Sequence, residues 1–219
     1  MRVHPSSRRR TVGILAAVTI ALVGNSCGTL PFDKPPPRLF LLTPKSTFRS
    51  DLPKVQWQLT IDVPIAEAGI NTSRIAVQRN PITIDYFEGA NWIDTAPRMV
   101  QTLLVESFEN SNRIVGVGRQ TGALRADYTL LVELREFQAE IDDLGSVPKA
   151  HVRLNAKLVR LPQRVIVGRK SADIAIEAKG PRLEDVVRAF DFALGKTLKS
   201  VVEWTLTKVP PTVTSRRRR

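Results

Sequence analysis

The side chains that could carry out chemistry are few and far apart in this sequence. The chain of 219 residues has one cysteine, Cys27, and two histidines, His4 and His151. An intrachain disulfide and a zinc site built from cysteines are therefore both excluded. Asp142 and Asp143 form an adjacent carboxylate pair, but they lie in a stretch typical of a solvated hairpin tip. With no base, nucleophile and orienting group in a recognisable pattern, we expect no enzyme, no metal and no cofactor.

The other titratable residues that could take part in chemistry lie on segments that are predicted to be strands. His151 falls on the polar side of an alternating run, where we expect a solvated position rather than a general base. Glu133, Glu136 and Glu140 are spread along one segment without a recognisable ligand spacing. A hydrolase whose site emerges only in the folded chain stays open as a minority alternative.

The net charge of +12 is concentrated at the two ends of the chain. Residues 1–26 hold four arginines and no acid, and residues 216–219 are four consecutive arginines, which leaves +4 for the rest. An arginine cluster on an exported chain favours anionic lipid head groups or an acidic partner, so we expect no nucleic acid as a partner. A solvated basic tail over residues 210–219 is the alternative.

The amino end has the layout of an export signal. Arg8, Arg9 and Arg10 precede the uncharged run Thr11–Gly24, which is rich in aliphatic residues. A positive segment followed by about 7–15 apolar residues predicts a secretory signal peptide, here residues 1–26. The run is shorter than the ~20 residues of a spanning helix, although a signal anchor extending to Leu30 is the alternative.

Cys27 stands directly after this signal. A lone thiol in an oxidising compartment can pair between chains, and this liability disappears when the sulfur carries a lipid. The small residues Gly24, Asn25 and Ser26 resemble a lipobox, although Gly24 stands where an aliphatic residue is usual. Gly28 resembles the position after the cysteine in lipoproteins sorted to the outer membrane. We expect Cys27 to be the lipidation site; a plain cleaved signal with an incidental cysteine is the alternative.

A proline-rich tether and a folded body follow Cys27. Pro35, Pro36 and Pro37 favour an extended conformation. We therefore predict that residues 27–37 comprise the lipidated cysteine and a short spacer. The folded domain is expected over residues 38–209.

The pattern of apolar residues predicts strands and two helices. Period-two alternation and short aliphatic runs predict strands at residues 38–42, 55–63, 74–78, 82–87, 113–117, 126–141, 151–161 and 165–176. Helical spacing predicts one helix after Asp94 or Thr95, ending at Asn110–Asn112, and a second helix from Leu183 to about Lys208. Short links between the last three strands predict an antiparallel meander. The order of elements predicts an α+β fold, a mostly antiparallel mixed sheet with both helices packed on one face.

Several segments, taken in order, carry a resemblance to a known family. They are Arg38–Pro44 after the tether, Leu59–Pro64, Arg74–Val77, Ile82–Phe87, Trp92 with Pro97 at a helix start, and Asp127–Phe137. This ordered set resembles the ABC-type transport auxiliary lipoproteins, the family that includes the paraquat-inducible protein C lipoprotein. The resemblance covers the chain from Cys27 to about Leu206.

The resemblance implies a non-catalytic envelope lipoprotein of an ABC-type lipid transport system. Its implied partners are an MCE-domain (mammalian cell entry type) protein and the ABC permease and ATPase, with docking at the periplasmic face of the outer membrane. An unrelated outer-membrane assembly or secretion lipoprotein is the alternative. A scaffold role is favoured over lipid carriage because the apolar face of the last helix is needed to cover the sheet. Free sheet edges would also allow copies of the chain to form a homo-oligomer.

Overall fold

The structure, a computed structural model, describes residues 35–120, 125–141 and 147–209. The chain divides into two units, Met1–Pro36 and Pro37–Arg219, and every described helix and strand belongs to the second. The expected signal peptide, the lipidation site Cys27, the pair Asp142 and Asp143, and the basic tail all lie outside the described residues.

The described elements follow the sequence expectations closely. In chain order they are β1 (Arg38–Phe40), β2 (Val55–Ile61), β3 (Ile65–Ala66), β4 (Arg74–Asn80), β5 (Thr83–Trp92), α2 (Ala96–Ser111), β6 (Ile114–Arg119), β7 (Tyr128–Glu140), β8 (Lys149–Arg160), β9 (Val165–Glu177) and α3 (Leu183–Lys208). Both predicted helices and all eight predicted strands are present, with shifts at their ends. The two-residue strand β3 was not predicted.

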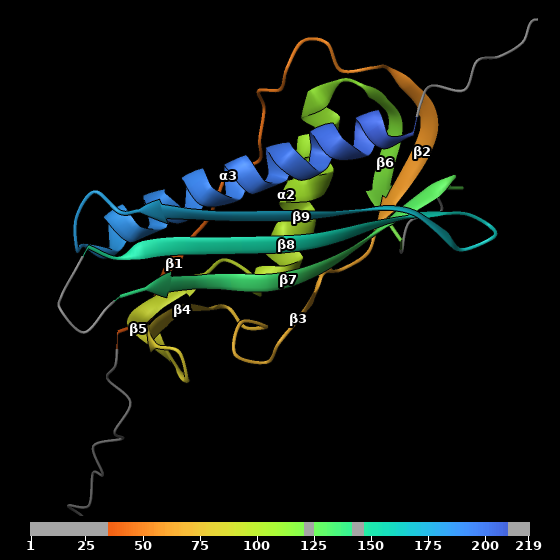
Figure 1. The fold of residues 1–219 in the computed structure, drawn as a ribbon. Helices are drawn as coiled ribbons and strands as arrows, with labels where there is room; N and C mark the ends of the chain where they lie inside the picture. The colour runs from red at the N-terminus through yellow and green to blue at the C-terminus, as the bar shows by residue number, and fades with distance from the viewer. Residues whose placement is uncertain (1–34, 121–124, 142–146, 210–219) are drawn as a thin grey trace, which may run out of the picture. The chain divides into compact units, whose positions relative to one another are not determined.

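The strands form one mixed sheet around β7 (Figure 1). One edge of β7 pairs along its length with β8, while the other edge pairs in turn with β2, β3 and β4. The pairings β7–β8, β8–β9 and β4–β5 are antiparallel, and the long ones confirm the predicted meander. The other five pairings are parallel and short. Parallel neighbours need a crossover connection, and the elements that lie between them in the chain supply it. The α+β fold class is confirmed.

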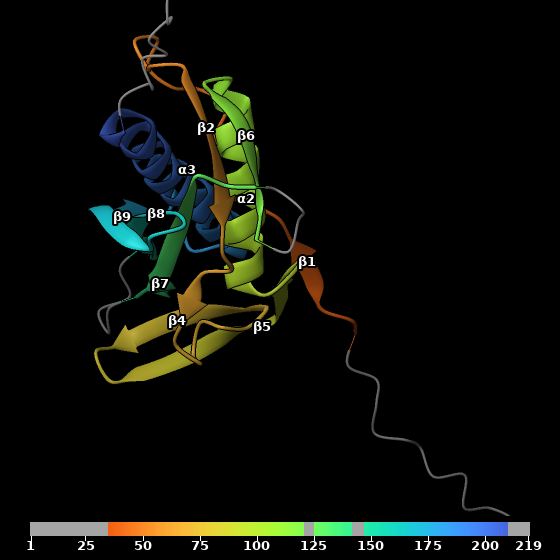
Figure 2. The same cartoon turned by 90° about the vertical axis from the view of Figure 1, so that its right-hand side faces the viewer.

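The two helices bury their apolar faces in a shared core. Helix α3 lies along β8 and β9 (Figure 1), and α2 lies beside β6 and β2 (Figure 2). Glu184 and Asp185 in the first turn of α3 and Lys208 in its last turn complement the helix dipole. The apolar residues of α3 belong to the core and cover the sheet, as the sequence pattern indicated.

An aromatic cluster joins α3 to the sheet. The rings of Trp92, Phe137 and Phe190 have centroids 5.2–5.6 Å apart, and each side chain is at most 1% exposed. Tilted and edge-on aromatic pairs at this spacing add to the free energy gained by burial. The cluster fixes the position of β5, β7 and α3 relative to one another.

Gly168 marks a close approach between β9 and α3. A Cβ at this position would lie 3.0 Å from Cζ2 of Trp204 and 2.8 Å from Cε of Lys208. The register also shifts beside it, between Leu158 and Val159 on β8. The bend predicted at this glycine is therefore a bulge under the carboxyl-terminal end of α3.

Candidate functional site

A row of charged side chains crosses the polar face of β7, β8 and β9, and we call it the charged ladder. It consists of Glu133, Glu136 and Glu140 on β7, His151, Arg153 and Lys157 on β8, and Asp173 on β9. The alternating neighbours of the β8 residues are buried in the core, so the ladder faces away from the core.

A β-bulge puts the three glutamates on one face. The register of β7 against β8 shifts between Leu134 and Glu136, which inserts Arg135 as an extra residue. Glu133 and Glu136 would point to opposite faces of a regular strand, since side chains alternate with a period of two. Gln138 accepts a hydrogen bond from the backbone N–H of Phe137 at 2.8 Å, so its side chain satisfies a donor beside the bulge.

Each glutamate of the ladder pairs with one base of β8. Nζ of Lys157 lies 2.8 Å from Oε1 of Glu133, and the guanidinium of Arg153 pairs with Glu136. Hydrogen bonds from Lys157 and then Arg135 lower the pKa of Glu133. Glu136 and Arg153 stand directly opposite each other, whereas Glu133 and Lys157 are diagonal neighbours. Opposite charges directly across a strand pair stabilise the sheet by a few tenths of a kcal/mol to about 1 kcal/mol, and long side chains also reach a diagonal partner.

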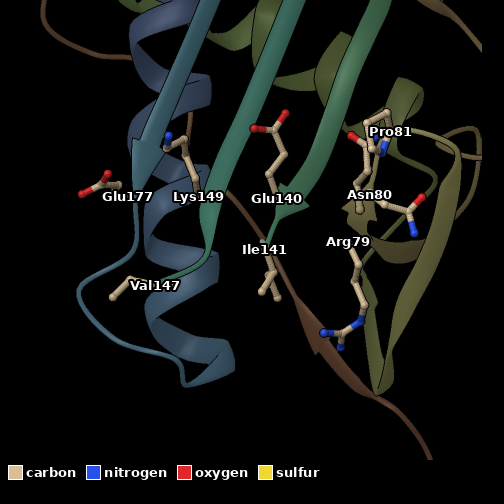
Figure 3. A pocket seen from close by; sticks show the side chains of 9 residues that line it. Arg79, Asn80, Pro81, Glu140, Ile141, Val147, Lys149 and Glu177 are labelled. Atoms are coloured by element: carbon tan, nitrogen blue, oxygen red, sulfur yellow. The ribbon is translucent and has the colours of Figure 1, made fainter. Parts of the chain in front are cut away.

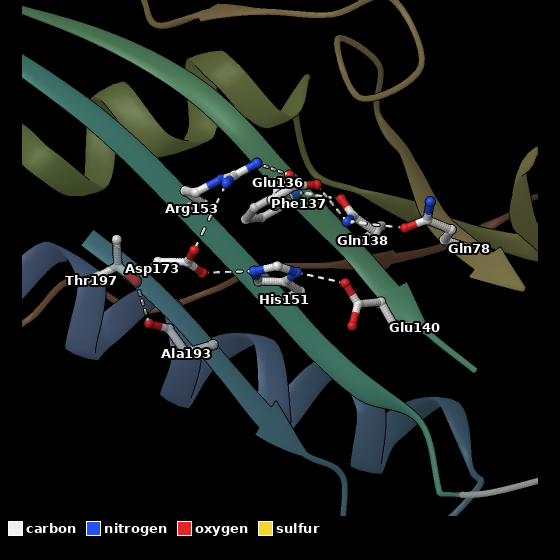
Figure 4. Close-up of polar contacts among 10 residues, drawn as sticks. All are labelled: Gln78, Glu136, Phe137, Gln138, Glu140, His151, Arg153, Asp173, Ala193 and Thr197. Atoms are coloured by element: carbon white, nitrogen blue, oxygen red, sulfur yellow. Dashed lines mark hydrogen bonds and ion pairs between the residues drawn. The ribbon is translucent and has the colours of Figure 1, made fainter. Parts of the chain in front are cut away.

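His151 is held between two carboxylates (Figure 4). Nδ1 lies 2.5 Å from Oε1 of Glu140, and Nε2 lies 2.7 Å from Oδ1 of Asp173. Burial lowers the pKa of His151, but hydrogen bonds to Asp173 and Glu140 outweigh it, so the pKa is raised. The side chain is only 20% exposed. His151 lies on the polar face, as predicted, and keeps partial contact with solvent; the carboxylates that neighbouring strands supply on both sides were not predicted.

Arg153 connects Glu136 to Asp173, one of the two carboxylates beside His151. Its guanidinium pairs with Glu136, its Nη1 lies 3.9 Å from Oδ2 of Asp173, and its buried Nε has no hydrogen-bond partner among the described residues. Gln138 donates to Glu136 at 2.7 Å and so extends the network toward β4. One connected network of charges therefore spans the three strands, made of Glu136, Arg153, Asp173, His151 and Glu140, and the ion pair of Glu133 with Lys157 lies beside it.

An open concavity of about 710 Å³ lies at one end of this face (Figure 3). Its lining comes from the ends of β4, β7, β8 and β9 and from residues beside them: Gln78, Arg79, Asn80, Pro81, Glu140, Ile141, Val147, Lys149 and Glu177. Glu140 belongs to both the ladder and this concavity. The mixture of both charges with a few apolar side chains differs from the mostly apolar lining of small-molecule sites.

The sequence candidates for chemistry do not converge on a reaction centre. His151 and the three glutamates meet, but they meet in ion pairs with bases or with each other. Within residues 35–120, 125–141 and 147–209, no three His, Cys, Asp or Glu side chains are grouped so that they could hold a metal ion. No helix in the same ranges has the length and apolar character needed to cross a bilayer.

The fold and this face define a class: an α+β domain with helices on one side of a mixed sheet and an ordered charged surface on the other. The family model described as the ABC-type transport auxiliary lipoprotein component matches residues 40–202. The chain belongs to this family. The family's description names a lipoprotein component that is auxiliary to ABC-type transport.

The chain is also similar to a curated relative and to solved structures. Protein XCC0632 from Xanthomonas campestris shares 30% identity and superposes with a TM-score of 0.73, covering 78% of this chain and 95% of that one. A second crystal structure, at 10% identity and a TM-score of 0.60, shares the fold over 77% of this chain and 97% of that one. Protein bll6063 of Bradyrhizobium diazoefficiens is 30% identical over 156 residues, which cover 69% of this chain. The match covers 40% of that curated relative's length.

Proposed function

We propose that this protein is the lipid-anchored docking subunit of an MCE-associated lipid transport system. It acts at the periplasmic face of the outer membrane and carries out no reaction. Its partners are an MCE-domain protein and, through it, the ABC permease and ATPase of the same system. The match to the transport auxiliary family over residues 40–202 is the observation that carries this proposal.

The anchor is assigned to Cys27. Residues 1–26 are removed as a signal peptide, Cys27 is acylated, and residues 27–37 hold the domain of residues 38–209 near the bilayer. Each buried CH₂ of an acyl chain contributes about 0.8 kcal/mol, so several chains on one cysteine hold the protein firmly. The basic tail of residues 210–219 contacts anionic head groups or an acidic partner.

The charged ladder is proposed as the docking surface for the MCE-domain protein. A face with ordered charges of both signs favours a partner with the complementary pattern and disfavours others, because a misplaced like charge is costly. The apolar faces of α2 and α3 lie largely in the core and are thus occupied. Pairing of free sheet edges would build a homo-oligomer around the same function.

Reversal of one ladder charge tests this docking surface. The variant Lys157→Glu places a carboxylate against Glu133, while Lys196→Glu makes the same change on the exposed side of α3. Both variants are extracted from membranes with the native protein, and the recovered MCE-domain protein is quantified. We expect Lys157→Glu to reduce recovery about tenfold, equivalent to about 1.4 kcal/mol of binding free energy, and Lys196→Glu to leave it unchanged.

Two outcomes would contradict the proposal. Equal recovery with both variants would exclude the ladder, provided that thermal unfolding shows both variants to be folded. A native protein that never recovers an MCE-domain protein, and instead recovers a secretion or outer-membrane assembly component, would replace the transport role.

Intact mass of the membrane-extracted protein tests the anchor separately. We expect a chain that begins at Cys27 and carries the mass of its acyl chains. A Cys27→Ala variant that stays membrane-bound and uncleaved would show a signal anchor in place of a lipid anchor.

A further inference from the structure

Three large aliphatic side chains form an exposed patch at the beginning of the domain, which we call the β1 patch. Leu39, Leu41 and Ile93 are 60%, 63% and 58% exposed. Strands β1 and β5 run parallel with Phe40 opposite Trp92, and the N–H of Ile93 donates to the carbonyl of Phe40 at 2.9 Å. Phe40 and Trp92 pack in the core, and Leu41 and Ile93 directly follow the two strands. Continuing the alternation one residue past the strand ends places Leu39, Leu41 and Ile93 on the outer face, as their exposure indicates.

Exposed aliphatic residues also lie close together in the chain at Val63 and Ile65 and at Ile82 and Ile84, but the β1 patch combines three of them from two neighbouring segments. Single exposed side chains are normal on protein surfaces, whereas adjacent ones that share a face mark a contact surface. Val115, on β6 at the other end of the strand order, is 62% exposed and provides a comparison of similar exposure.

Chain length determines what the patch can meet. Leu39 lies in the first strand of the domain, and Arg38 follows Cys27 by only 11 residues. Even a fully extended segment of that length reaches at most about 40 Å. If Cys27 carries the lipid, as proposed above, the patch lies on the part of the domain with the shortest connection to the bilayer.

We infer that the β1 patch is a membrane-contact surface that rests on the lipid bilayer beside the anchor. Aliphatic side chains of interfacial segments enter the boundary between head groups and acyl chains, to a depth of about 5–10 Å. Charged side chains border the β1 patch and would lie at the level of the lipid head groups. Arg38 pairs with Glu184 at 2.7 Å, and Asp94 follows Ile93. The contact orients the domain, so the opposite end of the strand order faces the periplasm. This inference rests on the lipid anchor of the proposed function.

A single labelled cysteine tests the contact in the full chain. Acylated Cys27 has no free thiol and is the chain's only native cysteine, so Leu41→Cys provides a unique site for an environment-sensitive fluorophore. Val115→Cys is the matched control. Each acylated protein is reconstituted into phosphatidylethanolamine–phosphatidylglycerol vesicles that contain lipids with a spin label near the head group. We expect the label at position 41 to lose about half of its emission or more, and the label at position 115 to keep it.

A second variant and four contrary outcomes keep the inference falsifiable. Adding Leu39→Asp to Leu41→Cys should reduce the quenching several-fold, because a carboxylate at position 39 opposes insertion. Equal quenching at both positions, or none at position 41 in a protein of acylated mass, would overturn membrane contact while leaving the anchor intact. Shielding of the label at position 41 that grows with protein concentration in detergent would show that a second copy of this chain covers the β1 patch. That result would also overturn membrane contact. A mass without acyl chains would refute the anchor itself, and with it this inference.

Discussion

Deprotonation of His151 is expected to destabilise the fold. Its two ring nitrogens each face a carboxylate, 2.5 Å from Glu140 and 2.7 Å from Asp173. The protonated ring donates to both carboxylates, whereas the neutral ring has one N–H and one acceptor nitrogen. Loss of the proton therefore leaves one nitrogen lone pair facing a carboxylate oxygen.

The magnitude follows from the hydrogen bond that is lost. A hydrogen bond to a charged group is worth about 1.5–3 kcal/mol, and the partial exposure of Glu140 and Asp173 reduces this to about 1–2 kcal/mol. The pKa of His151 is raised in the folded chain. A raised pKa contributes stability that is fully present below the unfolded-state pKa of about 6.5 and is lost as pH rises through the folded-state value.

Urea unfolding between pH 5.5 and 9 measures this loss, with the fluorescence of buried Trp57 and Trp92 as the signal. We expect the free energy of unfolding to fall by about 1–2 kcal/mol across this range in the native chain. The His151→Gln variant should lose most of this pH dependence, since the other groups titrate alike in both proteins. The reasoning fails if native and variant proteins show parallel pH profiles, or if stability rises with pH in the native chain alone.

Three further changes test the core, the bulge and the ladder. Phe190→Ala should reduce the free energy of unfolding by about 3–5 kcal/mol in urea titrations, because it opens a cavity in the aromatic cluster; a loss below 1 kcal/mol would contradict the packing. Gly168→Ala should lower the free energy of unfolding by about 1–2 kcal/mol, because the added Cβ pushes on Trp204. Gly195→Ala has open space around its Cβ and should raise the free energy of unfolding by up to about 1 kcal/mol. Thermal melting that gives both changes the same sign would refute the close approach at Gly168. Glu133→Gln should cost about 0.5–1 kcal/mol at pH 7, and the difference from the native chain should vanish as pH falls from about 4.5 through the lowered pKa of Glu133; a difference that persists in acid would show that the ion pairs are not its source.

Local patterns were sufficient to predict most of the elements. The alternation in β8, with Val152 and Leu154 against His151 and Arg153, is visible in the sequence and requires a strand with one buried face. Helix α3 begins and ends where the apolar periodicity and the flanking prolines indicated. Strand β3 has two residues, too few for any periodicity, and it is defined by pairing with β7 alone.

The charged ladder was not predicted, although its signal was present. The spacing of Glu133, Glu136 and Glu140 looks unsuitable for one face of a strand, because a regular strand alternates every residue. The phase of the apolar residues changes just before Phe137, and this change marks the bulge that realigns them. The partners on β8 and β9 depend on register, which no single segment contains.

The amino-acid sequence alone determined where strands and helices form, which side of each is apolar, and the order of segments that resembles the transport auxiliary family. The type of an element and its apolar side depend on residues that are close together in the chain, so local sequence patterns predict them. Tertiary structure decided which strands pair in parallel, that His151 lies between two carboxylates, and that Leu41 and Ile93 share one exposed face. Those arrangements join residues 11 to 69 positions apart, and their geometry is set by sheet register and core packing rather than by any local preference.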